Sequence, residues 1–172
     1  MAWARYHAYK WHRDTNHYYG KHPNEVPYEK HLEMVEAEAM RFLFLLPNDW
    51  NLKRLIIAAC LVHDCIEDAR VTYNDVKNAL GEELANFAFA LCNEKGKNRK
   101  ARANSKYYAG IRELKYATFI KLCDRLANVR YSLSPSGGRM AGGYKKENAE
   151  FEKQLFTEEY SSMFVELRNL LS

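Results

Sequence analysis

Apolar residues recur along most of this chain at the three- and four-residue spacing of an α-helix, and strand-like alternation is nearly absent. The clearest stripe follows Val26-Pro27, where a proline suits the first turn of a helix, and the Pro47-Asn48-Asp49 segment breaks it. Its members are Tyr28, Leu32, Val35, Ala39, Phe42 and Leu46. The next predicted helix covers residues 52–66, and because residues 55–62 are all apolar, it should be buried nearly all round.

Capping residues predict the helices that follow. Thr72 can cap a short helix that runs to Leu80 and ends at Gly81, and apolar spacing predicts another helix over residues 84–91. Residues 93–105 are polar and basic, so a loop or a loosely held helix start is expected there.

The second half of the chain predicts three more helices. A long one is expected over residues 114–133, with a shared face formed by Ala117, Ile120, Asp124, Ala127 and Tyr131. Glycines within residues 134–143 predict a mobile connection, followed by helices over 144–156 and 158–171, the last capped by Thr157. The expected architecture is all-α, a compact cluster of seven to nine helices.

Composition narrows the class of protein. A chain of 172 residues that is 47% hydrophobic and 28% charged is typical of one soluble globular domain, here residues 1–172. The net charge of +4 does not call for a nucleic acid or a membrane as partner. No apolar run approaches the ~20 residues that cross a bilayer. Four cysteines lie singly in apolar runs, as in reduced proteins, so a cytoplasmic location is expected; they are Cys60, Cys65, Cys92 and Cys123.

The first candidate for chemistry is the acidic cluster at the end of the apolar helix. His63-Asp64 is followed at four-residue spacing by Glu67 and Asp68, so each pair shares a helix face. Negative charge is disfavoured at a helix C-terminus, and a metal cation is the simplest group to offset that cost. The alternative for an isolated His-Asp pair is a capped helix end.

Asp124 is the second candidate, because it stands where the helical stripe calls for an apolar residue, with Asn128 one turn further along. A carboxylate in a core-facing row is costly unless it is paired with a base or binds a cation. An ion pair with Arg125 or another base is one alternative, and a metal site shared with His63-Asp64 is the other.

His31 would complete a metal site. Two histidines and two aspartates suit Mn²⁺, Fe²⁺, Co²⁺, Zn²⁺ or Mg²⁺, and His31 is the best-placed fourth ligand beside His63, Asp64 and Asp124. A hydrogen-bonded histidine at the edge of the core is the alternative. The N-terminal histidines recur every five residues, which is not a helical face, and of these His12 is a candidate to line the pocket; they are His7, His12, His17 and His22.

A basic run forms the last candidate. Residues 94–115 contain eight Lys or Arg residues, and such a run is either a solvated surface or a loop that folds over an anionic substrate. Tyr107 and Tyr108 could stack on a base, so single-stranded RNA is a competing ligand.

Three ordered segments together resemble one known family. They read Pro27-Tyr28-x-x-His31, then Leu-Val-His63-Asp64-x-x-Glu67-Asp68, then Lys121-Leu-x-Asp124-Arg125-x-x-Asn128. This set resembles the HD superfamily of metal-dependent phosphohydrolases. Within this superfamily, the three segments are similar to those of the hydrolase domain of the Rel/Spo-type alarmone enzymes and of the stand-alone small alarmone hydrolases.

The resemblance implies an HD-domain fold and a specific division of roles. A single Mn²⁺ would be held by His31, His63, Asp64 and Asp124. Glu67 and Asp68 would orient and deprotonate the attacking water, and Asn128 would hold that water or the scissile phosphate. The implied reaction removes the 3′-pyrophosphate of guanosine tetra- or pentaphosphate. A metal that acidifies water beside carboxylates that accept a proton fits hydrolysis chemically.

The substrate is expected to be a small phosphorylated nucleotide. The family usually carries Arg-Lys before the Pro-Tyr motif, whereas this chain has Gly20-Lys21. Phosphate contacts are expected from Lys21, Lys95, Lys97, Arg99 and Arg102. A phosphatase of another nucleotide, such as a nucleoside monophosphate or NADPH, is the alternative among enzymes. A non-catalytic helical module that binds RNA or a protein is the alternative outside them.

Overall fold

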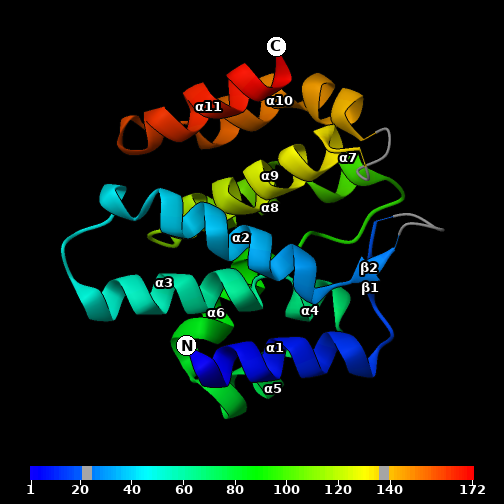
Figure 1. Cartoon of the computed structure of the whole chain (residues 1–172), viewed down its shortest axis with the longest axis vertical. Coiled ribbons are helices and arrows are strands. Elements are labelled where there is room, and N and C mark those ends of the chain that lie inside the picture. Colours follow the sequence, from blue (N-terminus) through cyan, green and yellow to red (C-terminus); the bar gives the residue numbers. More distant parts are fainter. Residues whose placement is uncertain (21–24, 136–139) are drawn as a thin grey trace.

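The computed structural model describes residues 1–20, 25–135 and 140–172, without the side chains of Arg99 and Lys100. The all-α prediction is confirmed, and nine α-helices of eight or more residues lie in these ranges (Figure 1). They are α1 (Ala2–Asp14), α2 (Glu29–Arg41), α3 (Trp50–Val62), α5 (Tyr73–Leu80), α6 (Glu82–Leu91), α8 (Ser105–Glu113), α9 (Ala117–Leu133), α10 (Ala141–Leu155) and α11 (Ser161–Leu171). The short helices are α4 (Cys65–Asp68), α7 (Arg99–Arg102), η1 (Leu43–Leu45) and η2 (Glu158–Tyr160).

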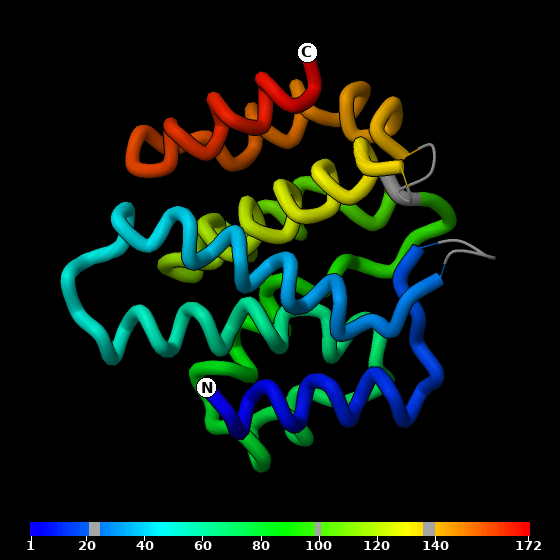
Figure 2. Tube along the Cα trace, in the orientation of Figure 1, coloured from blue at the N-terminus to red at the C-terminus, as the bar shows by residue number. Residues whose placement is uncertain are grey.

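Helix α9 lies at the centre of the molecule. It packs against α2, α3, α6, α8, α10 and α11. Along the trace in Figure 2, the α10–α11 pair covers one side of α9, while α2, α3 and then α1 follow on the other. Phe119, Ile120, Leu122 and Leu126 of α9 are fully buried. Any residue on α9 is therefore held rigidly relative to several neighbouring helices.

The predicted stripe after Pro27 is buried as expected, and its six members all belong to the core. The helix itself is shorter than predicted, because α2 ends at Arg41 and a 3-10 turn, η1, carries the chain to Leu46. Asp49 then caps α3 and accepts hydrogen bonds from the amides of Asn51 and Leu52.

The predicted helix over residues 52–66 was wrong in one respect: it is interrupted at the His-Asp pair. Helix α3 ends at Val62, His63 and Asp64 form a turn, and α4 begins at Cys65. The His63 ring explains the break, since its Nδ1–H donates to the carbonyl oxygen of Cys60 at 2.7 Å. In an unbroken helix that carbonyl would pair with the amide of Asp64.

Other differences concern elements that the apolar pattern did not indicate and the ends of predicted helices. Helix α1, the two-residue antiparallel strands β1 (Tyr18–Tyr19) and β2 (Val26–Pro27), and α8 as a separate helix were not predicted from the sequence. Gly142 and Gly143 lie inside α10 rather than in a connection. Thr157 makes no side-chain capping bond. Thr72 does cap α5, through a capping box with Asp75, and Gly81 ends it with φ +95°.

In the described part of the chain, none of the helices has the length and apolarity that a bilayer span requires.

Candidate metal centre and adjoining cavity

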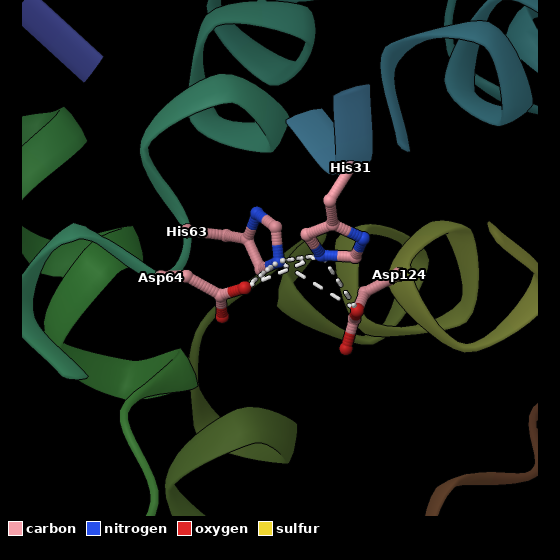
Figure 3. A group of neighbouring side chains, drawn as sticks. All are labelled: His31, His63, Asp64 and Asp124. Atoms are coloured by element: carbon pink, nitrogen blue, oxygen red, sulfur yellow. Dashed lines mark hydrogen bonds and ion pairs between the residues drawn. The ribbon is translucent and has the colours of Figure 1, made fainter. Parts of the chain in front are cut away.

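Four side chains from three segments converge in the interior, as Figure 3 shows. His31 comes from α2, His63 and Asp64 from the turn after α3, and Asp124 from α9. One nitrogen or oxygen of each lies within 4.8 Å of those of the others. Both histidines are buried, with 1% and 0% of their surface exposed. The helical spacing that put Asp124 in a core-facing row is the reason it arrives at this point.

The donor atoms face one another. His63 Nε2 lies 2.9 Å from Asp64 Oδ2 and 3.7 Å from Asp124 Oδ1, and His31 Nε2 lies 3.3 and 3.4 Å from the same two oxygens (Figure 3). The bond from His63 Nδ1 to Cys60 fixes the ring and leaves Nε2 directed at the carboxylates.

This donor set fits one divalent cation. Ligand atoms about 2.0–2.2 Å from a central ion stand about 3 Å apart when adjacent and about 4.4 Å apart when opposite. The separations here fall in that range. Imidazole nitrogens and carboxylate oxygens together suit first-row divalent metals, so the four residues can hold such an ion.

The charges at this cluster also favour a cation. Burial alone would raise the pKa of Asp64, but the positive charge of His63 and the hydrogen bonds from His63 and His31 together hold it well below its usual range. Burial likewise opposes ionisation of Asp124, yet Lys121 together with His31 and His63 holds the pKa of that carboxyl well below its usual range. The two carboxylates are therefore ionised and draw positive charge into the site.

Asp124 forms an ion pair, as one alternative from the sequence predicted, but its partner is Lys121 rather than Arg125. Its Oδ2 lies 2.8 Å from Lys121 Nζ, whereas Arg125 binds Glu147 instead. The other oxygen, Oδ1, faces both histidines and also accepts a hydrogen bond from Asn128. The ion-pair alternative and the metal alternative are thus compatible, because each uses a different oxygen.

Asn128 is held between the cluster and the β-hairpin. Its Nδ2 donates to the carbonyl and the carboxylate of Asp124, and its Oδ1 accepts from the hydroxyl of Tyr19 at 2.6 Å. Tyr19 stacks on the His31 ring, with centroids 4.7 Å apart. Tyr19 thus orients both an amide and a histidine of the site, a role that no signal in the sequence indicated.

Glu67 and Asp68 have different surroundings. Both oxygens of Glu67 accept hydrogen bonds from Asn93, whose amide and side chain donate at 2.9–3.1 Å. Asp68 accepts a bond of 3.3 Å from Tyr28, and the same hydroxyl lies 2.5 Å from Asp64 Oδ2. Burial, aided by the charges of Asp64 and Glu67, raises the pKa of Asp68 to about 7. Asp68 can therefore exchange a proton near neutral pH.

A cavity of about 720 Å³ opens from this cluster between α8, α9 and α10. Its lining includes His31, Asp64, Glu67, Asp68, Asp124 and Asn128, and also the basic residues Arg102, Lys121, Arg125 and Lys146. Tyrosine and phenylalanine rings complete the wall, at Tyr28, Tyr107, Tyr108, Tyr144 and Phe151.

Of the predicted phosphate contacts that the structure describes, only Arg102 lies at the cavity. Arg102 lines the cavity, and its Nη1 lies 4.0 Å from Glu67 Oε1. Lys95 and Lys97 are exposed and are not among the lining residues. Lys21 and the side chain of Arg99 lie outside the described residues. Lys121 and Arg125 were missed as cavity residues, although their i, i+4 spacing on one helix face was a usable signal.

Comparisons with known proteins agree on one group of relatives. No protein-family model matches the chain. Its sequence is 25% identical over 130 residues to the guanosine-3′,5′-bis(diphosphate) 3′-pyrophosphohydrolase MESH1 of Drosophila melanogaster, covering 76% of this chain and 67% of that protein. Its fold matches the solved structure of a metazoan ortholog of SpoT that hydrolyses ppGpp, with a TM-score of 0.74 and 20% identity over 97% of this chain and 90% of that chain. Sequence similarity and fold both agree with the resemblance carried by the three motifs.

Proposed function

We propose that this protein, which has the motifs and the fold of the stand-alone HD-type alarmone hydrolases, is a metal-dependent phosphohydrolase that removes the 3′-pyrophosphate of guanosine tetra- or pentaphosphate. The observation that carries the proposal is the opening of the two-His, two-Asp cluster, with Glu67 and Asp68 beside it, into one nucleotide-sized cavity. The catalytic unit would be a single domain over residues 1–172 in the cytoplasm.

The proposed cation is Mn²⁺, held by His31, His63, Asp64 and Asp124. When bound, it would acidify water and screen the charge of the phosphates. This ligand set is supported by hydrogen bonds that already orient two of the ligands. The carbonyl oxygen of Cys60 holds the His63 ring, and Lys121 holds the Asp124 carboxylate.

The carboxylate pair would handle the proton of the attacking water. A group is most effective as an acid or base when its pKa is near the working pH, and the pKa of about 7 suits Asp68 to this task. Glu67, fixed by Asn93, would orient the water. Asn128 would hold the water or the scissile phosphate. In the reaction, the bond between the ribose 3′ oxygen and phosphorus breaks, water supplies the new oxygen on phosphorus, and pyrophosphate leaves.

The basic residues would bind the phosphates. Arg102 at the cavity wall can grip phosphate with two parallel hydrogen bonds. Lys21, Lys95, Lys97 and Arg99 stay predictions for further phosphate contacts.

The test is product analysis by chromatography after incubation of the purified protein with Mn²⁺ and a nucleotide panel. We expect guanosine tetraphosphate to yield GDP and pyrophosphate, and we expect EDTA to stop the reaction. Asp64→Ala should lose metal and turnover together. Arg168→Gln, in an ion pair with Glu152 that does not line the cavity, is the matched control and should keep both. Turnover that persists without metal would refute the proposal.

The panel should include NADPH and nucleoside monophosphates, because this chain has Gly20 where the resembled family usually carries an arginine. Preferential release of phosphate from one of these would replace the guanosine substrate while leaving the reaction class intact. The non-catalytic alternative would be supported by the absence of turnover on every member of the panel.

A further inference from the structure

Arg125 is a buried cation with incomplete hydrogen bonding. Only 6% of its surface is exposed. Its Nη1 donates to Glu147 Oε2 at 3.2 Å, while Nε, which has no exposed surface, lacks a hydrogen-bond partner among the described residues. The guanidinium lies 4.7 Å from the ring centroids of both Tyr144 and Phe151. The rings fix the position of the charge without satisfying its N–H groups in the plane.

Such an arrangement is costly unless the guanidinium has a second partner at another stage. A buried N–H without an acceptor loses its hydration and gains nothing in return. Arg125 lines the 720 Å³ cavity, one residue after Asp124. An acceptor that enters the cavity and takes the place of Glu147 would meet a guanidinium whose position is already fixed by the two rings.

The two cations on this face of α9 are paired differently. Lys121 Nζ lies 2.8 Å from Oδ2 of the buried Asp124, so its charge is balanced by a carboxylate of the His/Asp cluster. The side chain of Glu147, the partner of Arg125, is 39% exposed and comes from α10 across the cavity. Because partly exposed ion pairs are weak, a stronger anion that enters the cavity can compete with this carboxylate for Arg125.

We infer that Arg125 is an anion-binding residue of the cavity, and that Glu147 is its resting counter-ion, displaced when a phosphate group of the substrate binds. This inference rests on the proposed function for the class of substrate. A phosphate offers more charge and more acceptor oxygens than the carboxylate, and arginine binds it through two parallel hydrogen bonds. The group bound would be a phosphate other than the one that reacts at the metal cluster.

The inference predicts opposite effects for the two members of one ion pair. Glu147→Gln removes the competing anion, so KM for the nucleotide and Kd for inorganic pyrophosphate should fall about two- to fivefold. Arg125→Lys keeps the charge but loses the planar donor group, so both constants should rise about tenfold or more. If the ion pair only braced the fold, KM and Kd would rise in both variants.

The experiment combines steady-state kinetics on the Mn²⁺-loaded protein with calorimetric titration of inorganic pyrophosphate. The controls are Glu152→Gln and Arg168→Gln. Each breaks the ion pair between Glu152 of α10 and Arg168 of α11, and neither residue lines the cavity. Both control variants should leave KM and Kd unchanged. Thermal unfolding of every variant separates loss of fold from loss of binding, and Glu147→Gln still tests the inference if Arg125→Lys does not fold.

The two proposals fail in different ways. If the wild-type protein hydrolyses nucleotides but Glu147→Gln leaves KM and Kd the same or higher, the counter-ion inference is overturned and the proposed function stands. If no nucleotide is hydrolysed, yet pyrophosphate binds more tightly to Glu147→Gln and more weakly to Arg125→Lys, the anion site stands and the proposed function fails.

Discussion

Acidification should destabilise this protein through His12, a fully buried histidine on α1. The ring stacks on Tyr28 with centroids 4.2 Å apart, its Nδ1 lies 3.0 Å from Nδ1 of His17, and its Nε2 lies 3.9 Å from Cys65 Sγ. Burial lowers the pKa of His12 from 6.5 to about 3, since there is little water to solvate the imidazolium. The folded protein therefore holds this ring neutral at pH values where the unfolded chain protonates it.

The magnitude follows from the two pKa values. Above pH 6.5 both states are neutral and His12 contributes no pH dependence. Below pH 6.5, His12 is protonated in the unfolded state but stays neutral in the folded state. The free energy of unfolding therefore falls by about 1.36 kcal/mol per pH unit until the pKa of the folded state is reached. Between pH 7.5 and pH 5.0 the loss is about 2 kcal/mol, or about 4–8 °C in Tm for a chain of this length.

Urea denaturation at pH 7.5 and 5.0, in EDTA to keep metal binding out of the comparison, measures this loss. The reference is His12→Gln, which keeps a polar side chain but cannot titrate. The free energy of unfolding of the wild type should fall by about 2 kcal/mol more than that of the variant. Equal losses in the two proteins would show that His12 is protonated in the folded state and would refute the reasoning.

Further predictions concern the cluster, the proton acceptors, the basic loop and the core. Asp124→Asn should abolish stoichiometric metal binding in elemental analysis. It should also remove a Mn²⁺-dependent rise of about 5–11 °C in Tm, the shift expected at 100 times Kd; wild-type metal content would contradict this. Glu67→Gln should keep the metal while kcat falls about 10²–10⁴-fold, and an active variant would exclude Glu67 from the chemistry. Neutralising Lys95 and Lys97 together should raise KM, and unchanged kinetics would assign both to the solvated surface. Phe119→Ala should cost about 3–5 kcal/mol in urea denaturation, because the ring is fully buried; a loss below 1 kcal/mol would mean that the core collapses around it.

Helical periodicity was enough to predict most of the main helices, and the chemistry of the ligands together with the family resemblance predicted the convergence of the four candidate ligands. A carboxylate in an apolar row is visible in the sequence alone, and so is a His-Asp pair at the end of an apolar run. Helix α1 was missed because its buried face consists of Ala4, Ala8 and His12, which give a weak apolar stripe. Small and polar residues can fill a helix interface without leaving a periodic signal.

The partners of the site residues could not be predicted in the same way. The bonds from Asn93 to Glu67 and from Tyr19 to Asn128 join residues 26 and 109 positions apart. Periodicity shows which face of a helix is buried, but not which neighbour it meets. The turn at His63 depends on one side-chain bond to Cys60 and has no signature in the apolar pattern.

The origin of the four candidate ligands has a consequence for the life of the protein in a cell. His31 and Asp124 are 93 positions apart (124 − 31), and they meet only when α2, α3 and α9 are docked. The unfolded chain contains no such site, so cation binding and helix docking form one equilibrium. The supply of the cation would then set how much of the protein is folded, and a core substitution that touches no ligand would appear as a loss of metal affinity.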